Sequence, residues 1–399
     1  MPGLLDGVRV VEVATWIAVP ACGALLADLG ATVIKVEAPT GDIWRATARR
    51  AGSGFPGNPA FQVDNRGKRS IAVNLEQPEG QAVVRRLLRS ADVLTTNLVP
   101  RRQHRYGLTY EMASAENPRL IYLAFSGYGD QGPERDRLGF DFTAFWARSG
   151  LLEAMTDPGM PPPMPPGSTG DHATAPLLLA GVLGALYERE RSGRGQRVAT
   201  SLLNSALWAI SSDLQQTLIA RQALPHTSRA EGNPVRNTYR SADGGWFLLM
   251  APEERDWPKL CAAIERRDLV TDARFATFAG RSAHSAELIA LLDGVFGARP
   301  LAELGPRFDA QGVVWGPVQS MRTAIDDPQV RANGYVTTVE HPTFGPFETP
   351  NTPLRYSRSE TGPKGAAPEI GQHTEEVLLE AGYTWDDIGA LQEVGAVGV

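Results

Sequence analysis

The stretch VRVVEVATWIAVPACGALLADLGATVIKVE (residues 8–37) decides the fold. It holds a β-branched run at 8–14, an apolar stretch at 22–29 that stops at Gly30, and a second β-branched run at 32–37. Such valine- and isoleucine-rich runs are typical of buried strands, and the stretch between them has the composition of a short helix. A strand, a helix and a second strand in this order form the unit from which parallel sheets are built.

The same alternation continues outward to about residue 130. A further strand is predicted at 70–75, and Pro78 then opens a helix whose apolar residues share one face. Two more strands are predicted at 93–98 and 120–125. We therefore predict an α/β fold, in which an open, Rossmann-like parallel sheet carries helices on both faces.

A proline-rich stretch, MPPPMPPGSTGD (residues 160–171), cannot continue a helix or a central strand. It predicts an exposed connection that leads into a helix beginning after Asp171. That helix is expected to stop at Gly193, and a second helical segment is expected at about 200–222.

Two changes of pattern predict domain boundaries. Residues 224–240 are polar and turn-rich, and the following residues to 332 contain a strand and helices of their own. Strands rich in Thr, Pro and Gly come next, with a helix near 374–381. We predict a first part at 1–223, a smaller α/β domain at 224–330 and a last part at 331–399.

Composition limits the function. The chain has 399 residues, of which 42% are hydrophobic and 21% charged, as in ordinary globular proteins. Its formal net charge of −6 argues against nucleic acid as a partner, because neutralising phosphates needs a basic surplus. Cys22 and Cys261 match no disulfide framework, and the N-terminal residues predict a strand rather than a signal peptide, so we expect a cytoplasmic protein. The longest apolar run, 177–187, is far shorter than the ~20 residues that cross a membrane, so no membrane partner is expected.

Three familiar motifs fail. The loop at 15–20 lacks the glycines with which a dinucleotide-binding turn approaches a pyrophosphate. The segment NRGKRS (65–70) lacks the upstream glycine of a phosphate-binding loop, since Gln62 stands there. The six histidines have no zinc-binding spacing, so no metal is expected.

Seven blocks follow one another along nearly the whole chain. They are LLADLGATVIKVEAPTGD (25–42), NRGKRSIAVNL (65–75), ADVLTTNLVP (91–100), SGYGDQGP (126–133), GDHATAPLLLAGVLGALYERERSGRGQRV (170–198), GPVQSM (316–321) and DPQVRANG (327–334). In this order the set resembles the class III CoA-transferases of the CaiB/BaiF type, which include formyl-CoA transferase and carnitine CoA-transferase. The α-methylacyl-CoA racemases are relatives of that family.

The resemblance implies a large open α/β domain formed by both ends of the chain, with a small domain between them. It also implies a homodimer whose two chains are interlocked as linked rings. The implied activity is transfer of coenzyme A from an acyl-CoA to a free carboxylic acid. Coenzyme A would be a substrate, and no further cofactor would be needed.

Asp171 follows Gly170 at the expected start of a helix. Taken alone, this position indicates an N-cap, whose carboxylate accepts hydrogen bonds from the first backbone N–H groups. The resemblance instead makes Asp171 the catalytic nucleophile. The helix dipole is expected to keep the carboxylate ionised, and the two roles are compatible.

The resemblance also implies a set of CoA contacts. Several lie where the predicted strands at 70–75 and 93–98 end, which is the edge where open sheets bind ligands. The asparagines there are equally typical of turns. Arg105 matches an arginine near the nucleotide end of CoA, and its guanidinium can stack on adenine or pair with a phosphate. The full set is Ile17, Ala18, Val73, Asn74, Leu75, Asn97, Leu98, Arg105 and Phe140.

Three positions depart from the family pattern. Ala38 stands where a basic residue is common, so Arg45 or Lys68 is the candidate for that phosphate contact. Phe140 stands where many transferases have Tyr and the racemases have an acid/base His, and phenylalanine cannot exchange a proton. Gly232-Asn233-Pro234 stands where some transferases have a run of glycines that closes over the acyl site.

The hypothesis is therefore a CoA-transferase that works through a thioester between Asp171 and CoA. A 2-methylacyl-CoA racemase is the nearer alternative. An NAD-dependent dehydrogenase and a non-catalytic acyl-CoA binder are the alternatives from other classes.

Overall fold

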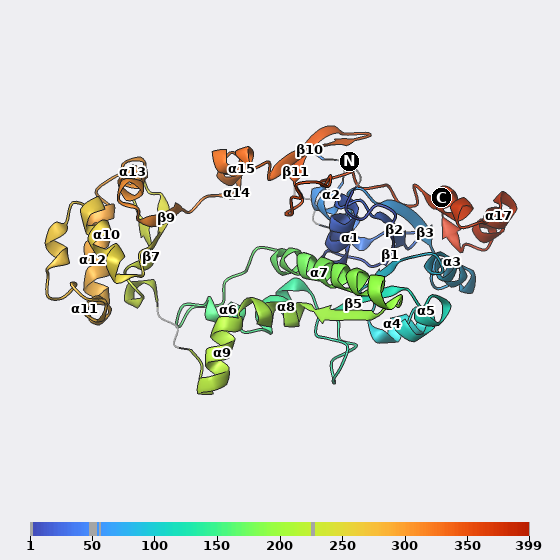
Figure 1. Cartoon of the computed structure of the whole chain (residues 1–399), viewed down its shortest axis with the longest axis horizontal. Helices are drawn as coiled ribbons and strands as arrows, with labels where there is room; N and C mark the ends of the chain where they lie inside the picture. The colour runs from blue at the N-terminus through green and yellow to red at the C-terminus, as the bar shows by residue number, and fades with distance from the viewer. Residues whose placement is uncertain (1–2, 48–53, 56, 225–227, 399) are drawn as a thin grey trace. The chain divides into compact units, whose positions relative to one another are not determined.

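The structure, a computed structural model of the chain, describes residues 3–47, 54–55, 57–224 and 228–398. The chain divides into two compact units (Figure 1). From the sequence, domain boundaries were predicted at 224 and 331, and the short piece at 154–162 was predicted to belong to the first part. The first unit is Met1–Glu153, Pro163–Ala220 and Arg331–Val399, and the second is Ala154–Pro162 and Arg221–Val330.

A seven-stranded sheet organises the first unit. Strands β1 to β5 run parallel, as predicted, β6 extends the parallel sheet beside β5, and β12 pairs antiparallel with β3 at the other edge. The strands β6 and β12 were not predicted. In spatial order the sheet consists of β12 (Val397–Gly398), β3 (Arg69–Val73), β2 (Thr32–Glu37), β1 (Arg9–Val13), β4 (Val93–Thr96), β5 (Ile121–Ser126) and β6 (Arg197–Ser201).

The strand order reverses at β1. From β1 the chain moves to β2 and β3 on one side, and it then returns to place β4 on the other side. The loops that follow β1 and β4 therefore leave the sheet in opposite directions and open a crevice at its carboxyl edge. Open α/β sheets bind their ligands at such a reversal.

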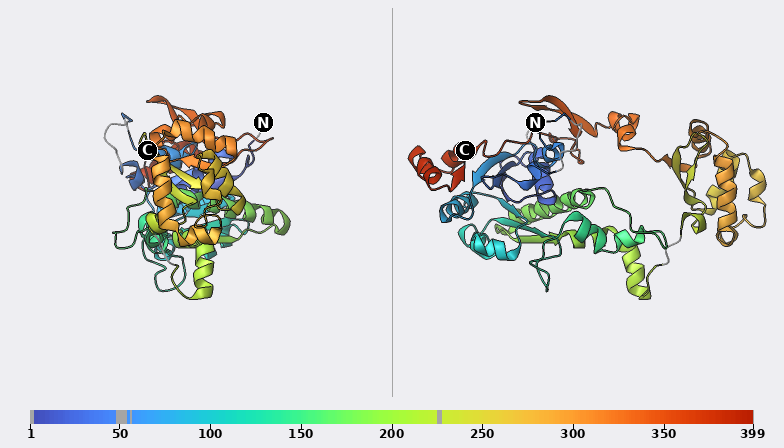
Figure 2. Two further views of the ribbon diagram at one scale, coloured as in Figure 1. Left: turned by 90° about the vertical axis from the view of Figure 1, so that its left-hand side faces the viewer. Right: turned by 180° about the vertical axis from the view of Figure 1, so that it is seen from behind.

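Successive side chains of β1 enter two different cores. Val10 belongs to the core beneath α1 and α7, whereas Val11 and Val13 belong to the core that includes α3, α5, α16 and α17. Helices thus cover both faces of the sheet, as predicted (Figures 1 and 2). The helices are α1 (Ala18–Asp28), α3 (Pro78–Leu88), α5 (Tyr110–Glu116), α7 (Thr169–Ser192), α16 (Thr374–Glu380) and α17 (Trp385–Glu393).

Shorter elements complete the first unit. The helix α7 ends at Gly193 in a left-handed conformation, as the sequence predicted. The segment expected to be helical at about 200–222 contains two helices that follow β6 directly. These elements are η1 (Ile43–Arg45), α2 (Pro59–Asn65), α4 (Pro100–Arg105), the π-helix η2 (Asp141–Ala147), α6 (Leu151–Ala154), α8 (Leu202–Ala209), α9 (Ser211–Ala220), and the hairpin of β10 (Val336–His341) and β11 (Gly345–Pro350).

The second unit has an aromatic core of its own. Phe247 contacts Phe296, Phe308 and Tyr239, and all four side chains are buried. They lie between an antiparallel three-stranded sheet and a group of helices. The elements are β7 (Arg236–Arg240), β8 (Trp246–Met250), η3 (Arg229–Glu231), η4 (Glu254–Asp256), α10 (Trp257–Ala263), η5 (Arg267–Val270), α11 (Phe278–Ala283), α12 (Ser285–Phe296), α13 (Leu301–Gln311), β9 (Val314–Pro317) and α14 (Met321–Ala324), and α15 (Pro328–Ala332) spans the boundary at 330.

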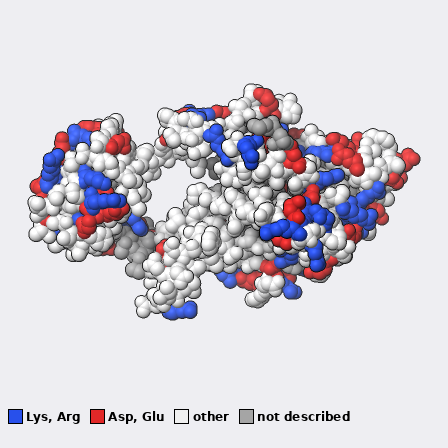
Figure 3. All heavy atoms as spheres, viewed as in Figure 1, with Lys and Arg blue, Asp and Glu red and all other residues white. Residues whose placement is uncertain are grey.

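Charge is mixed on the surface. On the face shown in Figure 3, basic and acidic side chains alternate on both units, while the area over α8 and α9 is nearly free of charge. Within the described parts of the chain, every helix is too short or too polar to span a bilayer.

Candidate active site

The loop after β1 is held across the crevice by Asn97. The side-chain amide of Asn97 donates to the carbonyl of Thr15 at 2.6 Å, and its oxygen accepts from the Thr15 N–H at 3.2 Å. The next residue, Trp16, has a φ of 69°, a left-handed conformation that is strained for a large side chain. Its N–H donates to the carboxylate of Asp42 at 3.3 Å. The loop is therefore fixed from two sides in a conformation that it would not adopt alone.

A buried network of charges lies beneath this loop. The ammonium of Lys35 contacts Glu12 at 3.2 Å and Asp42 at 2.9 Å, and it also donates to the Ala14 carbonyl. The ammonium of Lys68 donates to Glu12 and, at 2.8 Å, to the carbonyl of Pro20. Two ammonium groups thus face two carboxylates, and both ammonium groups also hold backbone atoms of the loop.

The network removes one of the two candidates for the expected phosphate contact. Lys68 is buried and has its three donors on Glu12, Pro20 and Asn65, while burial lowers its pKa to about 8. Arg45 donates through Nε and Nη2 to Glu37 and to the carbonyl of Pro368. Lys68 is therefore committed to the network, and a phosphate contact stays a prediction for Arg45.

Asp171 lies inside helix α7 and does not cap it. The N-cap residue is Ser168, in a left-handed conformation with a φ of 65°, and the helix begins at Thr169. Asp171 falls in the first turn, and its carboxylate accepts no hydrogen bond from any described residue. The prediction of an Asp171 cap, and of a helix that starts after Asp171, was wrong because Ser168 and Thr169 already belong to the helix start.

A second carboxylate lies against the start of the same helix. Asp141, at the beginning of η2, is only 4% exposed. Its carboxylate lies near the backbone N–H groups of Ser168, Gly170 and Asp171, which lower its pKa, but none of the described residues reaches full hydrogen-bond geometry. A Cβ placed on Gly170 would lie 2.2 Å from Oδ1 of Asp141 and 2.3 Å from the ring of Phe145. Only glycine lets η2 approach α7 this closely.

The pKa of Asp171 is raised to about 7. Burial is the main cause, and the negative charge of Asp141 is the second, while the adjacent His172 acts in the opposite direction. The expectation that the helix dipole keeps this carboxylate ionised at any neutral pH was therefore wrong. Burial and a like charge outweigh the dipole, because Asp171 is half-buried and has no donor of its own.

His172 belongs to the site and was missed in the sequence. Its Nε2 lies 2.8 Å from Oδ1 of Asp64, and the second oxygen of Asp64 accepts from the indole N–H of Trp44 at 2.9 Å. Asp64 comes from α2 and is fully buried. A separation of 108 residues left no local signal of this pair.

These residues surround a cavity of about 810 Å³. Trp16 forms one part of its wall, with the ring of Phe140 packed edge-on at 5.0 Å and Trp44 at 6.0 Å. Five of the predicted site residues line the cavity together, namely Ile17, Ala18, Asn97, Phe140 and Asp171. The rest of the lining is Trp16, Trp44, Thr47, Asn58, Pro59, Ala60, Phe125, Gly139, Asp141, Phe142, Gly167, Ser168, His172 and Leu202.

The other predicted residues lie outside this cavity. Leu98 lines an adjoining hollow of about 170 Å³ that shares Trp16, Asn97 and Phe140 with it. Arg105 is exposed and forms an ion pair with Glu76. The remaining three follow β3 beside the C-terminal strand: Val73 pairs with Val397, Asn74 bonds to the Gly395 carbonyl, and Leu75 packs against the adjacent core.

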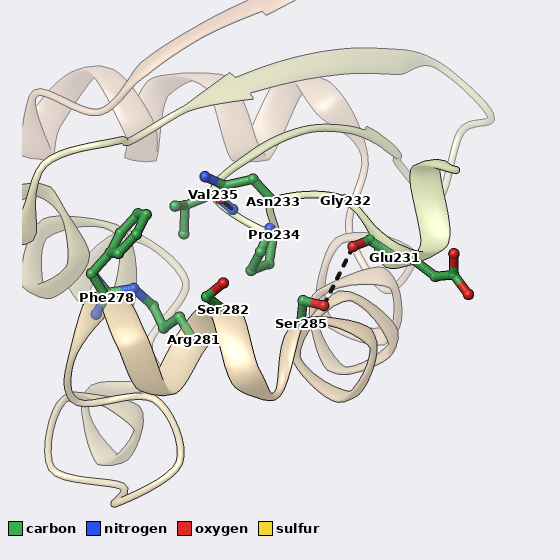
Figure 4. Close-up of a pocket in the computed structure, with 9 residues that line it drawn as sticks. All are labelled: Glu231, Gly232, Asn233, Pro234, Val235, Phe278, Arg281, Ser282 and Ser285. Carbon is green, nitrogen blue, oxygen red and sulfur yellow. Dashed lines mark hydrogen bonds between the residues drawn. The ribbon is translucent and has the colours of Figure 1, made fainter. Parts of the chain in front are cut away.

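The second unit has a smaller hollow of about 140 Å³ (Figure 4). Gly232, Asn233 and Pro234 line it, opposite Ser282 and Ser285 of the helices α11 and α12. Within the described residues, neither unit contains a group of His, Cys, Asp or Glu side chains that could hold a metal ion.

The chain was compared with known proteins. The family model described as CoA-transferase family III matches residues 5–374. Cinnamoyl-CoA:phenyllactate CoA-transferase of Clostridium sporogenes is 30% identical, over 98% of this chain and 96% of that protein. Succinyl-CoA–D-citramalate CoA-transferase of Chloroflexus aurantiacus is 34% identical, over 98% and 97%. A crystal structure of a CaiB/BaiF family protein from Brucella suis is 29% identical with a TM-score of 0.84, covering 96% of this chain and 100% of the other.

Proposed function

The chain belongs to CoA-transferase family III, and on that premise we propose that it moves coenzyme A between acids through a covalent bond to Asp171. The transfer of CoA itself follows from the family. The observation that supports Asp171 is its place in the cavity wall beside the β1–α1 loop, with a carboxylate that no described residue engages. A carboxylate committed to a structural hydrogen bond would be a poorer nucleophile.

The proposed chemistry conserves charge at every step. Asp171 attacks the thioester carbonyl, the carbon–sulfur bond breaks, and a mixed anhydride and CoA thiolate result. The thiolate then attacks the Asp171 carbonyl and releases the donor carboxylate, which leaves Asp171 bound to CoA as a thioester. The acceptor carboxylate attacks that thioester, and the same steps in reverse form the new acyl-CoA. No metal or redox group takes part.

The raised pKa of Asp171 suits this chemistry. At pH 7 about half of the enzyme carries the ionised carboxylate, because the pKa lies at about 7. A more basic carboxylate is a stronger nucleophile towards the thioester than an ordinary aspartate. Burial and the charge of Asp141 make ionisation of Asp171 costly, but at a pKa of about 7 the carboxylate still forms at neutral pH without a separate base.

CoA is proposed to enter along the carboxyl edge of the sheet. The cavity and its adjoining hollow follow the loops after β1 and β4, where Ile17, Ala18, Asn97 and Leu98 lie. Arg105 lies beyond the hollow with its guanidinium exposed, which fits a contact to the nucleotide end. For Val73, Asn74 and Leu75 we propose that only backbone atoms contact CoA, because β12 covers one side of that segment.

The acid substrate is proposed to have a bulky apolar body. The walls of the cavity include Trp16, Trp44, Phe125, Phe142 and other aromatic or aliphatic side chains. The relative from Clostridium sporogenes acts on phenyllactate, which has such a body, whereas the relative from Chloroflexus acts on the polar acid citramalate. The lining of this cavity supports the first class.

The working form is proposed to be an interlocked homodimer. The side chains of Trp208 and Ile219 on α8 and α9 are 74% and 76% exposed, in the area that Figure 3 shows nearly free of charge. Apolar side chains gathered in this way are typical of a surface that a partner covers. Sedimentation at micromolar concentration should give the mass of two chains, and a monomer would contradict the proposal.

The decisive experiment is a mass-spectrometric screen of acyl-CoA and free-acid pairs. Wild type should form new acyl-CoA species, and the peptide containing Asp171 should gain the mass of CoA in a form that hydroxylamine removes. Exchange without an adduct on Asp171 would overturn the covalent step. If no pair exchanges, deuterium uptake at Cα of a 2-methylacyl-CoA tests the racemase alternative, and a rise in melting temperature with NAD but not CoA tests the dehydrogenase.

A further inference from the structure

Among the described residues, the lining of the cavity offers few groups that could receive an anion. Of the described residues that line it, His172 is the only one whose side chain can carry a positive charge. Two carboxylates, Asp141 and Asp171, line the same cavity, and Asp64 lies directly behind His172. An incoming acid is itself an anion, so these charges oppose its approach unless a cation compensates them.

His172 is held in one orientation. Its Nε2 faces Asp64 at 2.8 Å, and Asp64 cannot turn away because its other oxygen is bound to the indole N–H of Trp44. Since Asp64 accepts at both oxygens, the Nε2 of His172 is the donor of this pair. The side chain of His172 is 44% exposed. The backbone carbonyl of Ser168, one turn earlier in α7, also lies near the ring and favours its protonated form. Asp64 therefore fixes one edge of the ring, while the exposed part of the side chain is accessible to a ligand.

The surroundings of His172 favour its protonated form. Burial opposes a charge on the ring, but the hydrogen bond to Asp64 and the negative charges of Asp64 and Asp171 outweigh it, so the pKa of His172 is raised. These carboxylates come from α2 and α7, and Asp141 adds a third negative charge from η2. An imidazolium here lines the same cavity as the carboxylate that is to react.

We propose that His172, held by Asp64, binds the carboxylate of the acid substrate and presents it to the thioester on Asp171. This assignment rests on the proposed CoA-transferase function and names one of its recognition groups. His172 and Asp171 line the same cavity and their charges interact, so an acid bound at His172 lies near the carboxylate that reacts. With His172 as the cation among the described lining residues, and with apolar walls, we expect a monocarboxylic acid with an apolar body to be the preferred substrate class.

The first test compares the effect of one substitution on the KM for the acid and on the KM for acyl-CoA. In His172→Gln the amide can still donate to Asp64, but the positive charge is gone. We expect the KM for the acid to rise roughly tenfold to a hundredfold, as for loss of a charge-assisted hydrogen bond, with the KM for acyl-CoA changed less than threefold. The matched control is His284→Gln in the second unit, where a histidine 45% exposed also lies near a carboxylate, that of Glu287. This control should leave both constants unchanged.

The second test uses pH. In wild type the KM for the acid should rise as the pH passes above the raised pKa of His172, because the neutral ring no longer attracts an anion. His172→Lys keeps a cation at higher pH and should hold the acid KM low to about pH 9. Asp64→Asn should move the rise in KM to lower pH. A purely structural histidine would give neither result.

The outcomes distinguish this assignment from the function beneath it. If wild type exchanges CoA while His172→Gln keeps the wild-type acid KM and pH profile, the assignment to His172 is wrong and the function stands. If wild type transfers CoA to none of the acids tested, the proposed function itself fails. Equal rises in both Michaelis constants would also reject the assignment, since they indicate general damage to the cavity.

Discussion

Replacing Asp171 by asparagine should stabilise the protein while abolishing its activity. The ordinary pKa of this carboxyl is 3.8, and the fold raises it to about 7. The folded state therefore binds the proton more tightly than the unfolded chain does. The contribution of this group to the free energy of unfolding is fully present below pH 3.8, falls as the pH rises, and is lost above about pH 7. Asparagine has the same size but never carries the charge.

The size of the effect follows from the difference between the two pKa values. Each pH unit corresponds to about 1.4 kcal/mol, so the difference of about three units sets a ceiling of about 4 kcal/mol. Asp171 is only half-buried, and its new amide must also find partners, so we expect a gain of about 1–2 kcal/mol above pH 7. For domains of this size that is roughly 2–8 °C in Tm. Exchange should fall by about three orders of magnitude, as when other nucleophiles are deleted.

Denaturation at pH 4 and pH 8 measures this directly. Asp171→Asn and wild type should differ little at pH 4, where Asp171 is protonated in the folded state and about half protonated in the unfolded state, and the variant should be the more stable at pH 8. Asp386→Asn is the matched control, because Asp386 is an exposed aspartate in the first turn of α17. A variant that is less stable than wild type at pH 8, or equally stabilised at both values, would refute the account of a costly buried charge.

Three other predictions follow from the same site. Asp141→Asn removes the like charge beside Asp171, so the pKa of Asp171 should fall. The loss of exchange activity at acid pH, expected near pH 7 in wild type, should then occur at lower pH, and activity at pH 6 should rise severalfold. An unchanged pH profile would show that Asp141 is not coupled to Asp171. Gly170→Ala should lower the free energy of unfolding by about 2 kcal/mol, measured by chemical denaturation, and reduce exchange, because the new Cβ overlaps Asp141 and Phe145. Wild-type stability in this variant would mean that η2 can move away from α7. Wild type should incorporate no deuterium at Cα of a 2-methylacyl-CoA, because Phe140 cannot exchange a proton, and appreciable incorporation detected by mass spectrometry would favour the racemase.

The sheet could be predicted where local pattern and burial agree. The runs at 8–14 and 32–37 are rich in valine and buried on both faces, and they form the central strands β1 and β2. The strand β6 has the sequence RVATS and is only partly buried, so nothing local distinguishes it from a loop. Its pairing with β5 depends on a segment about seventy residues earlier in the chain.

Residues of the candidate site could be proposed from the sequence, but its electrostatics could not. Asp171, Ile17 and Asn97, which the family resemblance proposed, line one cavity, and their roles stay predictions. The pKa of Asp171 depends on Asp141, thirty residues away, and on burial that only the packed fold defines. The orientation of His172 depends in the same way on Asp64.

The strand β12 has a consequence for how the protein is made. It pairs with β3, and the C-terminal residues Val377, Leu378 and Ile388 pack in the same core as the first strands. During synthesis, α3 and α5 can cover part of that face early, but the part that α16 and α17 cover stays exposed until the ribosome has passed the whole second unit, which has a core of its own. A nascent chain therefore carries an incompletely covered apolar face while the second unit is made, and it is then that a chaperone would have the most surface to bind.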